Sequence, residues 1–155
     1  MRRLAPSIVA LMLYAAAGLL PAAVRAELAA WDQTRVSEIG QQLAAACDAF
    51  WQAMRRQPGD TVGSGDAWDV SQLLHKAQTM QVQSTALAGH LRDGKGRDQT
   101  LNMYRDLKEL VDDTNDVLTP HAELDEPTLA AWAKVSDLMR QIAPYYDPKA
   151  TDTSQ

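Results

Sequence analysis

The chain has 155 residues with 15 basic and 20 acidic side chains, a formal net charge of −5, and a length that suits a single domain. Its acidic balance argues against nucleic acid and anionic membrane surfaces as partners, because both are bound through clustered lysines and arginines. The single cysteine, Cys47, excludes an internal disulfide, so the fold must be stabilised by its core.

The first predicted element is a cleaved secretory signal peptide covering residues 1–26. Two arginines lie near its start, and residues 8–20 form a short apolar run. Val24 and Ala26 are small residues at the two positions that a signal peptidase recognises. The apolar run is shorter than the roughly 20 residues that span a bilayer, so an uncleaved anchor is the disfavoured alternative. Cleavage leaves Glu27 as the N-terminus, with 12 basic and 20 acidic residues and no membrane span.

Four amphipathic helices are predicted after the signal peptide, and nothing there is typical of a strand. Apolar residues recur at intervals of three and four, which places them on one face of each helix. We expect the first helix at about 28–56 and the second at about 67–92. Asp98 is the expected N-cap of the third helix and Asp125 that of the fourth, which continues to the stretch from Pro144 to Pro148.

The expected fold is all-α, a single antiparallel four-helix bundle formed by residues 27–147, with a disordered tail at 148–155. The core faces predicted for the first and second helices are Val36, Ile39, Leu43, Ala46, Phe50 and Ala53, then Val70, Leu73, Ala77, Met80, Ser84, Leu87 and Leu91. Those predicted for the third and fourth are Met103, Leu107, Leu110, Thr114 and Val117, then Trp132, Val135, Met139, Ile142 and Tyr146. In the third helix Tyr104, Val111 and Leu118 widen the face on one side.

No cofactor or metal is predicted. Covalent haem attachment needs a Cys-x-x-Cys-His motif, and a non-covalent haem needs a ligand on a core face, where none of the three histidines lies. The Glu-x-x-His pairs of di-iron bundles and the spacing of a calcium loop are also missing from the sequence. A binder of small ligands or metal ions at one end of the bundle, near His90, Lys95 and Arg97, stays open as the alternative.

The chain is not expected to be an enzyme, because no nucleophile stands in a tight-turn motif with a partner histidine. An all-helical chorismate mutase is the enzyme class that suits an exported bundle of this size, and it remains an alternative. Such an enzyme binds a dianion through cations that point inward, whereas Arg35 and Lys76 only flank the predicted faces.

The candidate binding residues are three tryptophans off the core faces and part of an acidic run in the third helix: Trp31, Trp51, Trp68, Asp112, Asp113 and Asp116. The tryptophans either cover bundle ends and loops or form an apolar anchor for a partner. The acidic run is either a solvated face or a docking surface for a basic partner. The predicted function is therefore a non-catalytic interaction module, periplasmic or secreted, that binds an envelope protein of unknown identity.

Overall fold

The computed structural model describes residues 28–56, 67–118 and 124–148, with the backbone alone for residues 67–70. These residues form four α-helices, α1 (Gln33–Arg56), α2 (Ala67–Arg92), α3 (Arg97–Leu118) and α4 (Glu126–Ile142), followed by the short 3-10 helix η2 (Ala143–Tyr145). The predicted all-α class with four helices is confirmed. The predicted signal peptide and residues 149–155 of the predicted tail lie outside the described residues. None of the described helices combines the length and the apolar character needed to cross a bilayer.

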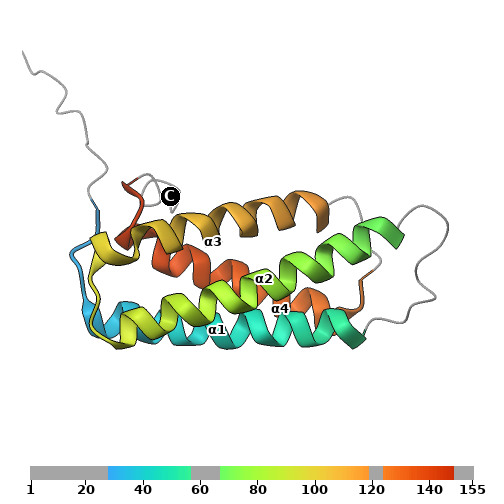
Figure 1. Ribbon diagram of the computed structural model, residues 1–155, viewed down its shortest axis with the longest axis horizontal. Coiled ribbons are helices and arrows are strands. Elements are labelled where there is room, and N and C mark those ends of the chain that lie inside the picture. The colour runs from blue at the N-terminus through green and yellow to red at the C-terminus, as the bar shows by residue number, and fades with distance from the viewer. Residues whose placement is uncertain (1–27, 57–66, 119–123, 149–155) are drawn as a thin grey trace, which may run out of the picture.

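The four helices lie along the long axis of the molecule, with α2 and α1 in front of α4 in Figure 1 and α3 along the upper edge. The start of α1, the end of α2, the start of α3 and the end of α4 meet at one end. Hydrogen bonds join these segments: Gln33 Nε2 donates to Leu91 O at 2.6 Å, and Ala29 N donates to Pro144 O at 2.9 Å. The closely packed pairs are α1 with α2, α1 with α4, and α2 with α3.

Helix α1 begins later than the sequence predicts, at Gln33 and not near Leu28. The carboxylate of Asp32 explains the difference, because its Oδ1 accepts a hydrogen bond from Arg35 N at 3.0 Å. A side chain that accepts from a backbone N–H three residues ahead satisfies one of the unpaired donors of the first turn. Asp32 therefore acts as the N-cap, and Trp31 lies before the helix.

The N-cap predicted for α3 is also wrong. It begins at Arg97, so Asp98 lies within the first turn, where its negative charge meets the positive end of the helix dipole. The side chain of Gln99 reaches back, and its Oε1 accepts from Gly96 N at 3.2 Å, as the third helical residue does in a capping box. The cap predicted for α4 is confirmed, since Asp125 Oδ1 accepts from Thr128 N at 3.0 Å.

The core faces predicted for α1 and α4 are buried, and so is that of α2 from Leu73 onward; the Val70 side chain lies outside the described ones. In α3 the predicted face is rotated. Tyr104, Leu107, Val111, Thr114 and Leu118 are buried, whereas Met103, Leu110 and Val117 are half-buried. The buried face of α3 is thus shifted toward the side of Tyr104, Val111 and Leu118, the residues expected only to widen it.

Candidate functional site

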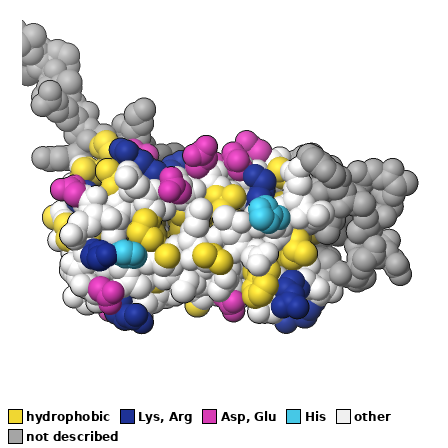
Figure 2. All heavy atoms as spheres, in the orientation of Figure 1, with side chains coloured by type: hydrophobic (Ala, Val, Ile, Leu, Met, Phe, Trp, Pro, Cys, Tyr) yellow, Lys and Arg dark blue, Asp and Glu magenta, His cyan; other side chains and the backbone are white. Residues whose placement is uncertain are grey.

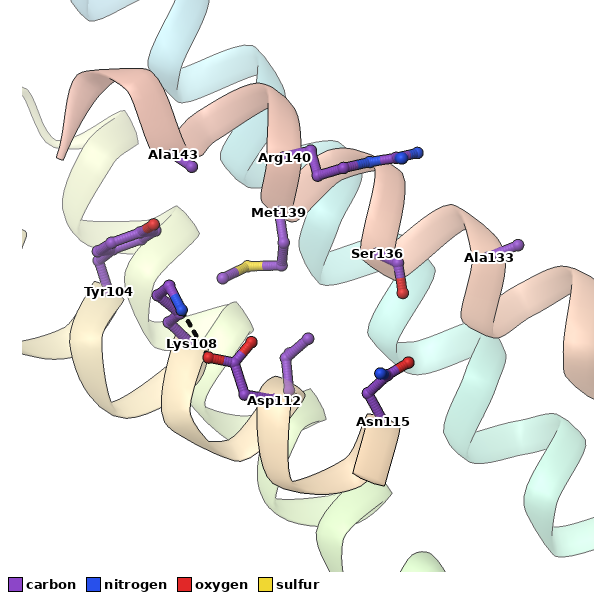
Figure 3. A pocket seen from close by; sticks show the side chains of 10 residues that line it. Tyr104, Lys108, Asp112, Asn115, Ala133, Ser136, Met139, Arg140 and Ala143 are labelled. Atoms are coloured by element: carbon purple, nitrogen blue, oxygen red, sulfur yellow. Dashed lines mark hydrogen bonds and ion pairs between the residues drawn. The ribbon is translucent and has the colours of Figure 1, made fainter. Parts of the chain in front are cut away.

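The candidate site is a groove between α3 and α4. These two helices are neighbours in the bundle, but they do not pack closely against each other. The groove has a volume of about 500 Å³ and is open to solvent on one side. Figure 3 shows a row of lining residues on each helix; Met139 and Ser136 of α4 point toward α3, whereas Arg140 and Ala133 point away from it. The α3 row is Tyr104, Lys108, Val111, Asp112 and Asn115, and the α4 row is Ala133, Ser136, Met139, Arg140 and Ala143.

Helical periodicity explains both rows. Residues separated by three or four positions lie on one face of a helix, so the steps from Tyr104 to Lys108 and on to Asp112 follow one stripe along α3. The same spacing joins Ala133, Ser136 and Arg140 along α4. Small side chains on α4 leave the space open.

The floor of the groove is apolar and continuous with the core. Val111 and Met139 are buried members of the hydrophobic core and also line the groove. Leu129 lies four residues before Ala133, so it extends the α4 stripe by one turn beyond the groove, and 41% of it is exposed.

Charged side chains stand at the groove edges. Lys108 Nζ binds Asp112 Oδ2 one turn along α3, at 2.5 Å, and Arg140 Nη2 binds Asp137 Oδ1 at 3.3 Å on α4. The acids and Arg140 are well exposed, and exposed pairs of this kind contribute little to stability.

Tyr104 stands at one end of the groove, where Figure 3 shows it nearest to Ala143. Only 2% of the residue is exposed, and its hydroxyl has no hydrogen-bond partner among the described residues. Burial, assisted by the negative charges of Asp147 and Asp112, raises the pKa of the Tyr104 phenol above its ordinary value, so the group stays protonated. A buried hydroxyl without a hydrogen-bond partner costs free energy.

Two of the three candidate tryptophans, Trp31 and Trp51, lie away from this groove. Trp31 packs edge-on against Tyr145 and Tyr146 at the end of the bundle, with ring centroids 6.4 and 5.5 Å apart. The guanidinium of Arg97 lies 5.5 Å from its ring and donates to Ala29 O. Trp31 thus holds the segment before α1 against the end of the bundle.

Trp51 is half-buried and packs against the core, with the Arg55 guanidinium 5.0 Å from its ring centroid. It does not join Trp31 in one surface, since the two belong to opposite ends of α1. The side chain of Trp68, at the start of α2, lies outside the described part of the chain.

The predicted acidic residues separate into different surroundings. Asp112 lies at the edge of the groove, and Asp116 is exposed one turn further along α3. Asp113 points toward α2, where its Oδ2 accepts from Lys76 Nζ at 3.3 Å. Acidic side chains gather along the upper edge of the face in Figure 2, over α3.

The alternative binding site at the end of the bundle was predicted near His90, Lys95 and Arg97. Arg97 is turned toward Trp31, and the backbone N–H of Lys95 donates to His90 O at 3.0 Å, as part of the turn after α2. His75 is exposed on α2, and His121 lies outside the described residues. Within the described ranges no three or more His, Cys, Asp or Glu side chains form a group that could hold a metal ion.

A second hollow, of about 550 Å³, lies between α2 and α3 and is lined mainly by polar side chains of α2 around His75 and Lys76. Its one α3 residue is Leu110, which belongs to the half-buried side of that helix. Lys76 already binds Asp113 there. This hollow has less apolar floor to offer a ligand than the α3–α4 groove has.

Sequence reasoning missed Tyr104, Lys108, Met139 and Arg140 as site residues. The sequence did carry one signal, because Tyr104, Val111 and Leu118 widen the predicted α3 face on the side that the structure turns toward the core and the groove. A scan against protein-family models, a search of curated proteins and a search of solved structures found no match for this chain.

Proposed function

We propose that this protein is an exported, non-catalytic binding protein, built as an antiparallel four-helix bundle, and that the α3–α4 groove is its binding surface. The observation that carries the proposal is the groove itself, a hollow of about 500 Å³ between two helices whose lining includes the core residues Val111 and Met139.

A binding role is favoured over catalysis by the chemistry of the groove. A chorismate mutase would need free cations converging on a dianion, whereas Lys108 and Arg140 each bind a carboxylate of their own helix. The raised pKa of Tyr104 keeps its phenol protonated and makes it a weak candidate for a general base. Neither of the usual nucleophiles, serine or cysteine, pairs with a histidine at this groove.

Export rests on the pattern of residues 1–26 and predicts a defined N-terminus. Protein recovered from the periplasm or medium of an exporting host should have the intact mass of a chain that begins at Glu27, because the small residues before Glu27 suit a signal peptidase. A species that keeps Met1 and sediments with membranes would contradict export and indicate an anchored protein.

The binding surface is tested with N-phenyl-1-naphthylamine, an uncharged apolar dye whose fluorescence rises when it leaves water. We expect the wild-type protein to bind this dye, and the variant Ser136→Trp to bind it at least about fivefold more weakly, because the indole fills the groove between the two helices. Titrations of dye fluorescence measure the affinities. Circular dichroism checks that the variant keeps its helices.

The matched control is Ala86→Trp, which adds the same indole at an exposed position of α2 outside the groove. This variant should keep the wild-type dye affinity. If Ser136→Trp and Ala86→Trp bind the dye equally well, the groove is not the binding surface and the proposal is wrong.

A further inference from the structure

The segment before α1, residues 28–32, links the two helices on either side of the groove, and we call it the N-terminal strap. The backbone N–H of Ala29 donates to Pro144 O, just after α4, at 2.9 Å. The carbonyl oxygen of Ala29 accepts from Arg97 Nη2, at the start of α3, at 2.6 Å. One residue of the strap therefore connects α3 with the end of α4, although these helices do not pack closely against each other.

Trp31 holds the strap against the end of the bundle. Its ring meets Tyr145 and Tyr146 edge-on, and the Arg97 guanidinium lies 5.5 Å from the ring centroid. Its Nε1 donates to Oε1 of Gln33 at 3.0 Å, and the same side chain also bonds to the end of α2. The strap is thus tied to α2, to α3 and to the segment after α4 by side chains as well as by backbone.

The contacts of the strap reach one end of the groove. Tyr146, which Trp31 meets on one side, stacks on Tyr104 of α3 with ring centroids 4.3 Å apart. The hydroxyls of Tyr146 and Thr100 are hydrogen-bonded at 2.7 Å, which adds a second link to α3. Tyr104 lines the groove, and so does Ala143 at the start of η2. Loss of the strap would therefore remove support from the contacts that join α3 to the segment after α4 at this end.

The groove offers little apolar surface at the helix spacing seen here. Val111 and Met139, the core residues in its lining, are each only 6% exposed. More of these side chains becomes accessible when α3 and α4 move apart. A protein whose binding-competent state is populated only in part binds with an affinity reduced by that fraction, so a contact that limits the spacing also limits the affinity.

We propose that the N-terminal strap is a clasp that holds α3 and α4 together at the Tyr104 end of the groove, so that its release widens the groove. The inference rests on the proposed function, because it states how access to the same groove is controlled. Helix spacing is measurable whether or not the groove binds a molecule, so the clasp and the binding surface can fail separately.

Double electron–electron resonance between spin labels measures the spacing in the full protein as purified. The labels are attached to cysteines introduced in a Cys47→Ala background. The pair near the clasp is Asn102→Cys on α3 with Arg140→Cys on α4, since both residues are exposed and Arg140 points away from α3 in Figure 3. The pair at the far end of the same helices is Asp116→Cys with Ala130→Cys, also at exposed positions.

Two variants should release the clasp. Trp31→Ala and Arg97→Ala should each widen the distance distribution of the near pair at least about twofold and leave the far pair unchanged, because one end of the bundle opens locally while the rest stays folded. Circular dichroism checks the helices. Arg97→Ala decides the test if Trp31→Ala loses its helices, because it keeps the contacts of the Trp31 ring with the two tyrosines.

The chain offers a matched control for each variant. Trp51→Ala removes another half-buried tryptophan with an arginine over its ring, at the other end of α1. Arg92→Ala removes an exposed arginine at the same end of the bundle as the strap. Both controls should leave the near pair unchanged. A near pair that is equally narrow in the wild type, Trp31→Ala and Arg97→Ala would overturn the clasp, and so would equal broadening of both pairs.

Binding of N-phenyl-1-naphthylamine connects the clasp to the groove. Trp31→Ala should bind the dye at least about threefold more tightly than the wild type, because the open state is more populated. Adding Ser136→Trp to Trp31→Ala should remove this gain, and a gain that survives would place the dye elsewhere and reject control of the groove by the strap. A near pair that widens while no protein binds the dye would support the clasp and reject the groove as a binding surface.

Discussion

Replacing Phe50 with alanine is expected to lower the free energy of unfolding by about 3–5 kcal/mol, the usual cost of deleting a fully buried aromatic ring. Phe50 lies on α1 with no exposed surface, and its ring centroid is 5.1 Å from that of Trp132 on α4. The variant therefore loses apolar burial and an aromatic contact at the α1–α4 interface, and the surrounding helices can refill the space only in part. Chemical denaturation followed by circular dichroism measures the change.

Gln42→Ala is the matched control, because Gln42 is exposed on the same helix. Its effect should stay within about 0.5 kcal/mol, as for most surface substitutions. Comparable losses in Phe50→Ala and Gln42→Ala would mean that the α1 face assigned to the core is wrong.

The thiol of Cys47 is expected to make stability depend on pH in the alkaline range. Burial raises the pKa of Cys47 from 9.0 to about 11, and a hydrogen bond with Ser84 lowers it by a smaller amount. Between these pH values the unfolded chain ionises its thiol while the native chain keeps it protonated, so the unfolded state is favoured. The contribution of the protonated thiol to the free energy of unfolding is constant well below pH 9. This contribution falls by about 2–3 kcal/mol in all as the pH rises toward about 11.

Comparison with Cys47→Ala isolates this contribution, because the other groups that titrate near pH 10 are common to both proteins. The wild-type free energy of unfolding should fall relative to that of Cys47→Ala between pH 8 and 11, and a flat difference would contradict the raised pKa. Cys47 should also react slowly with a thiol reagent at pH 8 until the protein is unfolded, since the residue is buried and protonated.

Periodicity and capping alone were enough to predict much of the fold. In α1, α2 and α4 the intervals of three and four residues identified the buried faces, because the residues at those intervals share one side of a helix. The cap at Asp125 was predictable for a similar reason, since a carboxylate before a helix bonds to backbone N–H groups only three residues away. Local geometry decides such features, and the sequence records local geometry directly.

The start of α1 shows where local reasoning was insufficient. Apolar and small residues before Trp31 continue the appearance of a helix, but this segment instead crosses the end of the bundle, tied by Arg97 to Ala29 and by Ala29 to Pro144. Those partners lie far away in the sequence, so no pattern in the first helix could reveal them. The same holds for Asp113, which is paired by Lys76 of α2.

The candidate site was decided by tertiary structure. The α3 sequence carries apolar residues over a broad arc, and its pattern permits burial of either Met103, Leu110 and Val117 or Tyr104, Val111 and Leu118 beside Leu107 and Thr114. Only the positions of the neighbouring helices choose the second set and bring the Lys108 to Asn115 edge opposite α4. A groove is the space between two surfaces, and periodicity describes each surface without its distance from the other.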